Sequence, residues 1–167
     1  MDRFFPAQHK NILLGRGDDC ALLNCPAEIC LSTDIFMENV HFKTSYFSAA
    51  DIGYKALAVN LSDIAAMGAE PLGFALNLMF PRDLNKEFFQ EMFAAMSGLA
   101  QEYDLPLVGG DLSSAACLGL DITIWGQSTN GFLTRRKCKP GDLLFIIGEI
   151  GLARVGLQIL EKKGKAA

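Results

Sequence analysis

Five aspartates occupy positions at which a carboxylate could bind a metal ion. Asp18 and Asp19 follow a glycine in GRGDDCALL, Asp34 ends the run STD, and Asp111 follows two glycines in GGD. Asp63 differs from these, because it interrupts the almost wholly apolar stretch NLSDIAAMGAEP. A buried carboxylate is costly unless it is paired or bound to a metal. We therefore expect Asp63 to lie opposite a positive charge.

The chemistry that suits these carboxylates is magnesium-dependent binding of phosphate. Ser32 and Thr33 would add hydroxyl oxygens beside Asp34, and neighbouring glycines let the backbone approach a ligand closely. Gathered carboxylates repel one another unless cations neutralise them. Mg²⁺ prefers oxygen ligands and usually shares its coordination shell with phosphate oxygens. The set indicates phosphoryl transfer, in which metal ions neutralise charge and the protein mainly positions groups.

Each of these residues also has a purely structural interpretation, which the sequence leaves open. Asp18 or Asp19 could be a turn residue beside Gly17. Asp34 could cap the segment that follows it, and Asp111 could form an Asx turn. The familiar nucleotide-binding loops, G-x-x-x-x-G-K-[ST] and G-x-G-x-x-G, do not occur, so an ATP site must be of another kind.

Composition narrows the class of protein. The 167 residues are half apolar, which favours one compact domain with a short appendage. The formal net charge is −4 and the basic cluster RRKCK (135–139) is short, so we expect no nucleic-acid partner and interpret the cluster first as a solvated loop. No run of 18 apolar residues occurs, which argues against a membrane span.

Cysteine and histidine usage points to a reducing compartment. The five cysteines are odd in number and form no C-x-x-C, so we expect free thiols in the cytoplasm rather than disulfides or a zinc site. The N-terminus has no apolar signal core. The histidines, His9 and His41, are too few for most metal or triad chemistry, so any catalytic metal would have oxygen ligands.

The elements that must position these residues follow from periodicity and capping signals. A helix is predicted over 51–68, with Asp51 at its start and Gly68 at its end. A second helix is predicted over 84–103, capped by Asn85 or Asp83. Its apolar stripe is predicted to face the core and comprises Phe88, Phe89, Met92, Phe93, Met96, Leu99 and Tyr103.

Short apolar runs predict strands at 28–34, 72–80, 105–111, 118–128 and 143–148, and another helix follows 150. Strands outnumber helices, and the helices lie between hairpin-like runs. This order predicts an α+β fold, with a mixed or antiparallel sheet and helices on one face.

Five segments, in order along 14–156, resemble thiamine-monophosphate kinases. They are GRGDDCALL, STDIFMENVHF, DIGYKALAVNLSDIAAMGAEPLGFALNL, LVGGDLSS and RRKCKPGDLLFIIGEIG. The same superfamily holds aminoimidazole-ribonucleotide synthetase, selenophosphate synthetase and a hydrogenase-maturation protein. Residues 51–69 are the most specific part of the resemblance.

The resemblance implies the N-terminal domain of the aminoimidazole-ribonucleotide synthetase-like fold, dimerising through its sheet as a homodimer. It implies a cleft near the dimer interface that holds ATP and several Mg²⁺ ions. The implied reaction transfers the γ-phosphoryl group of ATP to thiamine monophosphate and yields thiamine diphosphate.

Site residues carried over by motif are implied in the same way. The metal ligands would be Asp18, Asp19, Ser32, Thr33, Asp34, Asp63 and Asp111. Gly109, Gly110 and Asp111 would lie beside the nucleotide, and Arg135 would meet the ATP phosphates. His41 and Phe42 occupy the family's VHF position, near the thiamine phosphate substrate.

Two departures from the family pattern stand out. Arg136, Lys137 and Cys138 replace small residues in the family's R-S-G-A-K-P-G-D segment. Family members are also about twice as long, so we expect residues 1–138 to form the ATP- and Mg²⁺-binding domain and residues 139–167 to begin a truncated second domain. The segment 143–160 is then expected to be disordered or to dock onto an apolar surface of a neighbouring subunit.

Three functions remain open at this point. The first is the N-terminal half of a thiamine-monophosphate kinase, weak or inactive alone. The second is another ATP-dependent enzyme of the superfamily; selenophosphate synthetase is disfavoured because its reactive cysteine segment is not seen here. The third is a non-catalytic nucleotide-binding or dimerisation module.

Overall fold

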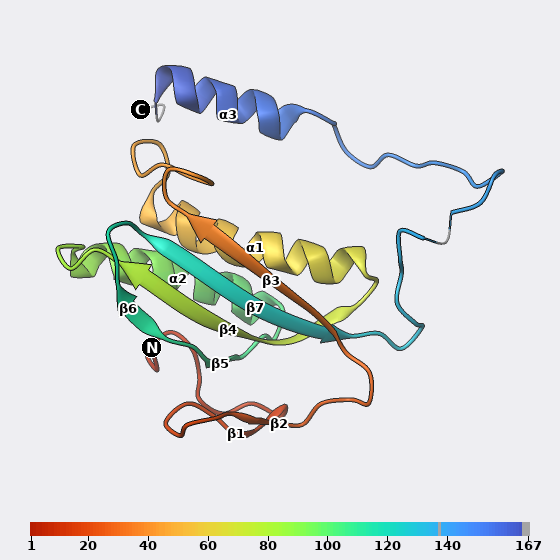
Figure 1. Cartoon of the computed structure of the whole chain (residues 1–167), viewed down its shortest axis with the longest axis horizontal. Helices are drawn as coiled ribbons and strands as arrows, with labels where there is room; N and C mark the ends of the chain where they lie inside the picture. Colours follow the sequence, from red (N-terminus) through yellow and green to blue (C-terminus); the bar gives the residue numbers. More distant parts are fainter. Residues whose placement is uncertain (137, 165–167) are drawn as a thin grey trace.

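The computed structural model describes residues 1–136 and 138–164, and it has two helices packed on one face of a mixed five-stranded sheet (Figure 1). This confirms the α+β class and the placement of the helices on one face. The elements in chain order are β1 (Ile12–Leu14), β2 (Leu22–Leu23), β3 (Cys30–Met37), α1 (Ala49–Ala66), β4 (Glu70–Phe80), α2 (Lys86–Glu102), β5 (Leu107–Gly109), β6 (Leu112–Ser114), β7 (Gly119–Gln127) and α3 (Leu152–Lys163).

Strand β4 is the centre of the sheet. The order is β3-β7-β4-β5, and β3, β7 and β4 pair antiparallel. On its other edge β4 pairs in parallel with β5 and then with β6. The two short strands therefore follow one another along the same edge, and the chain between them, around Gly110 and Asp111, interrupts the ladder.

The helix ends lie close to the predicted positions. Helix α1 begins two residues before Asp51, because Ser48 is the N-cap and forms a capping box with Asp51. The helix ends just before Gly68, whose φ of 65° is in the left-handed region as predicted. Asn85 caps α2 by accepting from the backbone N–H of Phe88.

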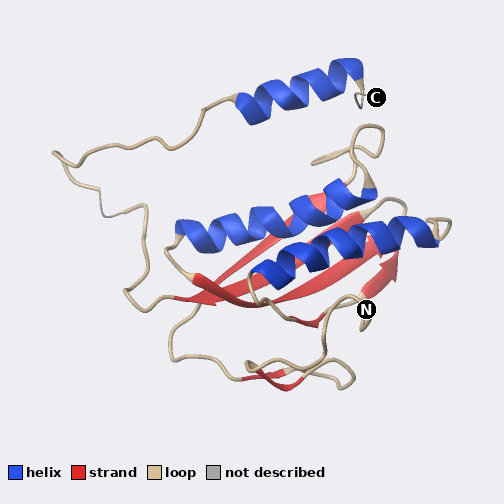
Figure 2. Cartoon of the chain, turned by 180° about the vertical axis from the view of Figure 1, so that it is seen from behind, coloured by secondary structure: helices blue, strands red, loops and turns tan. Residues whose placement is uncertain are grey.

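The main core lies between the two helices and the sheet, and Figure 2 shows both helices on that face. Helix α1 crosses α2 at Gly53, where an added Cβ would lie only 2.0 Å from the Met92 carbonyl oxygen. Most of the predicted stripe of α2 is buried or packed against the core. The prediction was wrong for Tyr103, which is 49% exposed because α2 has reached its C-terminal end there.

The opposite face of the sheet, called here the outer face, is covered only in part. A second apolar cluster of Leu72, Val108 and Trp125 is covered by Ile12 of β1 and Leu23 of β2. These two strands form a small sheet that the sequence patterns did not reveal. Elsewhere this face has large exposed apolar side chains, including Leu31 and Ile35.

Arg16 ties the N-terminal segment to the sheet. Its guanidinium donates to the backbone carbonyls of Phe5 and Leu107 and forms an ion pair with Asp2 at 2.9 Å. The Arg16 side chain is only 16% exposed. Because it directly precedes the GDD turn, these contacts fix that turn against β5.

Replacing Arg16 with alanine is expected to lower the free energy of unfolding by about 2 kcal/mol, because buried carbonyls lose a charged donor. Differential scanning fluorimetry would measure this loss, and hydrogen exchange would show faster opening of residues 1–16. Arg3→Ala is the matched control, since Arg3 contacts only the Phe4 ring among the interactions described for it. Equal effects of the two substitutions would contradict the anchoring role.

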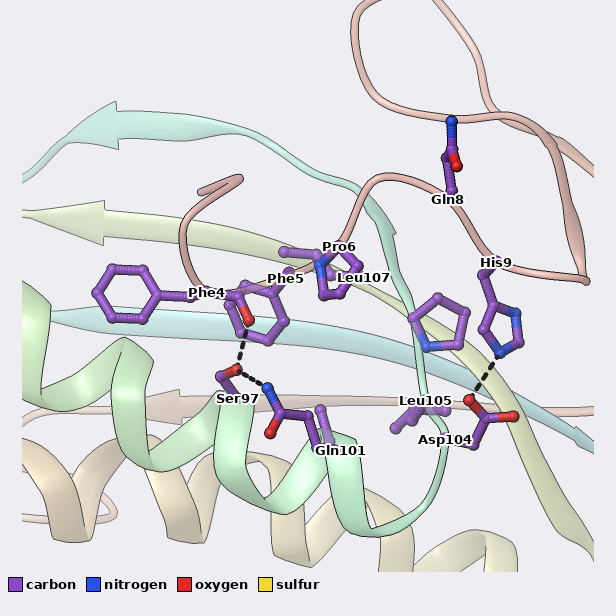
Figure 3. A pocket seen from close by; sticks show the side chains of 12 residues that line it. Phe4, Phe5, Pro6, Gln8, His9, Ser97, Gln101, Asp104, Leu105 and Leu107 are labelled. Atoms are coloured by element: carbon purple, nitrogen blue, oxygen red, sulfur yellow. Dashed lines mark hydrogen bonds and ion pairs between the residues drawn. The ribbon is translucent and has the colours of Figure 1, made fainter.

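A small pocket of about 190 Å³ lies where the N-terminal segment meets the end of α2 (Figure 3). The Ser97 hydroxyl donates to the Phe4 carbonyl, and His9 Nε2 lies 3.2 Å from the Asp104 carboxylate.

The pKa of Asp104 lies below its usual range, chiefly because the Lys10 ammonium hydrogen-bonds the carboxylate. The contact between Lys10 and Asp104 therefore stabilises the folded chain at pH values above the ordinary carboxyl pKa. This stabilisation is lost as the pH falls through the lowered pKa of Asp104.

The C-terminal part of the described chain differs from prediction. Residues 143–148 do not form the predicted strand, and their apolar side chains are largely exposed, up to 99% for Ile147. An apolar strand needs a neighbour with which to pair, and none lies beside it in the described residues. The following helix, α3, forms as predicted. No helix among the described residues is long and apolar enough to cross a membrane.

Candidate functional site

Two hollows at the sheet contain most of the predicted site residues. The first, of about 430 Å³, lies between the loop 15–21 and residues 107–112, and we call it the glycine-turn hollow. Asp18, Asp19 and Asp111 line it together with Gly109 and Gly110. Two motifs about 90 residues apart in sequence, GDD and GGD, thus face one space.

The GGD turn is built against β4. Gly110 has a φ of +143°, and an added Cβ would lie 1.8 Å from the Leu76 carbonyl oxygen. Only glycine satisfies both constraints. The Asp111 carboxylate accepts a hydrogen bond from the Ser113 hydroxyl at 2.9 Å, so its oxygens are held at the edge of the glycine-turn hollow.

The second hollow, of about 750 Å³, lies at the end of α1, and we call it the helix-end hollow. Ser32, Asp63 and Arg135 line it. The Ser32 hydroxyl donates to the Asp63 carboxylate at 2.7 Å, which joins the STD and NLSD motifs directly. Arg135 lines the same hollow, but no ion pair joins it to Asp63 among the described residues, so the expected positive charge opposite this aspartate stays a prediction.

The expectation that Asp63 is buried was wrong. Its side chain is exposed, because the buried face of α1 at this point is formed by Leu61 and Ile64. The carboxylate is consequently not costly in the fold, and the reason to assign it a role is its hydrogen bond with Ser32 in a hollow that Arg135 also lines.

The three residues of STD do not share one face of β3. Side chains alternate along a strand, so Ser32 and Asp34 lie on the helix-covered face while Thr33 lies on the outer face. There the Thr33 hydroxyl donates to the Asp121 carboxylate at 3.2 Å. The structure thus brings Ser32 to Asp63 but places Thr33 beside a carboxylate on β7.

The VHF pair is divided between surface and core. Phe42 is 1% exposed and stacks on Phe36 in the core, so its side chain cannot meet a substrate. His41 is exposed; its Nδ1 accepts from the Met37 backbone N–H at 3.0 Å and its ring stacks on Phe36. Of the pair, only His41 presents a side chain to a ligand.

The carboxylate and hydroxyl oxygens of the two hollows are suitable ligands for a Mg²⁺ ion that is also coordinated by phosphate oxygens. Among the described residues, no three His, Cys, Asp or Glu side chains lie close enough together to hold one ion. Mg²⁺ in nucleotide enzymes is usually bound by one or two carboxylates, and waters and phosphate oxygens complete its shell. The helix-end hollow offers the carboxylate of Asp63, and in the glycine-turn hollow one or two of the three carboxylates would bind a given ion, so the residues fit a metal that arrives with a nucleotide.

Sequence reasoning missed three residues that hold the site together: Arg16, Asn77 and Asp121. Arg16 belongs to GRGDD, which was too short a motif to interpret alone. Asn77 is the single polar residue of FALNLMF, and Asp121 is the single charged residue of LDITIW. A lone polar residue on an otherwise apolar strand was the signal that could have indicated them.

Lys137, one of the departures from the family pattern, lies outside the described residues. Its neighbours Arg136 and Cys138 are exposed.

The fold and these motifs define the class of protein. The family model described as "AIR synthase related protein, N-terminal domain" matches residues 17–128. The chain belongs to this family.

Within that class, the chain is similar to thiamine-monophosphate kinases. It is 40% identical to the Bacillus subtilis (strain 168) enzyme over 156 residues, covering 91% of this chain and 48% of the relative. The crystal structure of thiamine-monophosphate kinase from Stenotrophomonas maltophilia K279a matches with a TM-score of 0.84 at 36% identity, over 94% of this chain and 50% of that one.

A structure of AaThiL complexed with AMPPCP and TMP matches with a TM-score of 0.77 at 31% identity, covering 83% of this chain and 44% of that one. The chain spans about half the length of the curated relatives it matches.

Proposed function

We propose that this chain provides the ATP- and Mg²⁺-binding half of a thiamine-monophosphate kinase. The complete activity would transfer the γ-phosphoryl group of ATP to the phosphate of thiamine monophosphate and yield thiamine diphosphate. The observation that carries the proposal is the meeting of the GDD and GGD motifs in the glycine-turn hollow. The relatives' names and the AMPPCP and TMP complex support the choice of substrates.

The residues would act mainly by positioning phosphate groups. Gly109 would let a nucleotide approach the backbone, and Gly110 lets the turn lie against β4. One or two of the carboxylates of Asp18, Asp19 and Asp111 would hold each Mg²⁺ ion beside the nucleotide. Bound Mg²⁺ would neutralise the charge that develops on the transferred phosphoryl group. In the helix-end hollow, Asp63 with Ser32 would hold a further ion.

A cationic side chain and an exposed ring would contact the two substrates. Arg135, in the helix-end hollow, would pair with phosphate oxygens of ATP. His41, on the turn after β3, would contact the thiamine phosphate. Thr33 and Asp34 remain proposed ligands, and the conformation of β3 presents them on opposite faces of the sheet.

A homodimer formed through the outer face of the sheet is part of the proposal. The exposed apolar residues Leu31 and Ile35 leave there a surface that a second copy would cover. Sedimentation velocity tests this: a species with the mass of two chains supports the dimer, and a monomer at micromolar concentration opposes it.

Asp63→Asn is expected to weaken Mg²⁺-dependent binding of a fluorescent ATP analogue at least about tenfold, since a charged ligand to the metal is replaced by a neutral amide. The fold should stay intact, because the side chain is exposed. Fluorescence anisotropy measures the affinity and thermal unfolding measures the stability. Asp83→Asn, an exposed aspartate ahead of α2, is the control. Unchanged affinity in Asp63→Asn would remove Asp63 from the site.

Product formation tests the complete proposal. The chain would be incubated with ATP, Mg²⁺ and thiamine monophosphate, alone and with the C-terminal half of a thiamine-monophosphate kinase added as a separate polypeptide. Thiamine diphosphate in the second mixture is the expected result. ATP binding without product in either mixture would instead favour a non-catalytic nucleotide-binding module.

A further inference from the structure

We infer that Asn77 is a positioning residue that fixes the Gly109–Asp111 turn for nucleotide binding, and that the carboxylate of Asp121 sets the orientation of its amide. This inference rests on the proposed function and adds to it two residues outside the family motifs.

Asn77 lies beside the break in the parallel ladder of β4. Ala75 pairs with Gly109 of β5, and Leu78 pairs with Leu112 of β6. Between these pairs the chain turns through Gly110 and Asp111, so regular ladder hydrogen bonds cannot continue. A backbone N–H in such a break needs another partner.

The Asn77 side chain supplies that partner. Its Oδ1 accepts from the Asp111 backbone N–H at 3.0 Å, while the Asp111 carbonyl accepts from the Leu78 backbone N–H at 2.8 Å. The Gly110 Cα also lies against the Leu76 carbonyl. Three consecutive residues of β4 therefore hold the turn, and Asn77 is the member that holds it through a side chain.

Asp121 determines which way the Asn77 amide points. The two residues are paired directly opposite each other on β4 and β7. Asn77 Nδ2 donates to Asp121 Oδ2 at 3.0 Å. An ionised carboxylate only accepts hydrogen bonds, so the amide nitrogen must face Asp121 and the amide oxygen must face the Asp111 N–H.

The same carboxylate reaches the STD motif. Asp121 Oδ1 accepts from the Thr33 hydroxyl at 3.2 Å. A continuous set of hydrogen bonds thus runs on the outer face from Thr33 through Asp121 and Asn77 to Asp111. Through these hydrogen bonds, the position of the GGD turn depends on Thr33 of β3, which is two strands away from β4 in the sheet.

The test compares four variants of the full chain. Asn77→Ala removes both hydrogen bonds, and Asn77→Asp places a second carboxylate opposite Asp121. Asn77→Asp combined with Asp121→Asn exchanges the two groups, so that an amide again donates to a carboxylate and an oxygen again faces the Asp111 N–H. Gln127→Ala, six residues further along β7 on the same face of the sheet, is the control.

Two readouts separate positioning from general stability. Amide hydrogen exchange at Asp111 reports on the turn, and calorimetric titration with AMPPCP and Mg²⁺ reports on binding. We expect Asn77→Ala and Asn77→Asp to speed exchange at Asp111 and to weaken AMPPCP binding, each about five- to tenfold. The double exchange should restore both. Melting temperatures should change no more than in Gln127→Ala, because Asn77 is exposed.

The experiment distinguishes failure of the proposed function from failure of the role inferred for Asn77 and Asp121. If the unsubstituted chain shows no Mg²⁺-dependent AMPPCP binding, the proposed function fails and this inference fails with it. If that binding occurs and Asn77→Ala leaves it unchanged, the inference alone is overturned. Failure of the double exchange to recover the binding that Asn77→Asp alone has weakened would overturn the orienting role of Asp121.

Discussion

Gly110→Ala is expected to abolish Mg²⁺-dependent nucleotide binding, because the turn that carries Asp111 cannot keep its position with a Cβ at residue 110. The added atom would lie 1.8 Å from the Leu76 carbonyl oxygen, and Gly110 has a φ of +143°. Backbone strain of this kind and overpacking each cost about 1–3 kcal/mol. The turn would relieve both by moving away from β4, which would carry Asp111 out of the glycine-turn hollow.

Gly98→Ala is the control for this prediction. An added Cβ at Gly98 meets no atom within 4 Å, and Gly98 does not line the glycine-turn hollow, so this variant should leave nucleotide binding unchanged. Titration with an ATP analogue in the presence of Mg²⁺ would compare the two variants. Binding by Gly110→Ala that equals binding by Gly98→Ala would show that the turn does not contribute to the site.

Gly53→Ala is expected to lower the free energy of unfolding by about 3 kcal/mol or more. An added Cβ would lie 2.0 Å from the Met92 carbonyl oxygen and 3.1 Å from its Cα. The contacted atoms belong to the backbone of α2, so the helices can only separate. Overpacking of a well-packed core costs about 1–3 kcal/mol and occasionally more. Here the added methyl group would lie between the backbones of two helices, α1 and α2, and neither backbone can adjust as a side chain would.

The control lies in the other helix. Gly98 of α2 has no atom within 4 Å of an added Cβ, so Gly98→Ala should stabilise the chain by up to about 1 kcal/mol through helix propensity. Urea unfolding followed by circular dichroism would measure both changes. Opposite signs are expected for the two substitutions; a neutral Gly53→Ala would mean that α1 and α2 do not pack as closely as described.

The parts of the fold that were predicted are those with strong local signals. Helix α2 combines an asparagine cap with a long apolar stripe, and β4 and β7 are apolar runs long enough to identify. Strands β1, β2 and β6 are two or three residues long, so they have too little pattern to recognise. The segment 143–148 has the composition of a strand, but strand formation depends on a partner, which composition does not specify.

The candidate site was predicted in its residues but not in its arrangement. Motifs indicated Asp18 and Asp111 separately. The pairing of β4 with β5 and β6 places Asp111, and the contacts of Arg16 with Phe5 and Leu107 hold the loop of Asp18 beside it. Asp63 was expected in an apolar environment, and the face of α1 on which it lies makes it exposed. The role of Asn77 depends on a break in the ladder, which no local pattern in the sequence marks.

The most direct test of the central claim is the effect of Mg²⁺ on nucleotide binding by the chain itself. Isothermal titration with AMPPCP would be run once with Mg²⁺ and once with EDTA. We expect saturable binding with Mg²⁺ that is lost or strongly weakened in EDTA, because the carboxylates in both hollows repel phosphate unless a cation lies between them. Equal affinity under the two conditions, or no binding under either, would contradict this expectation.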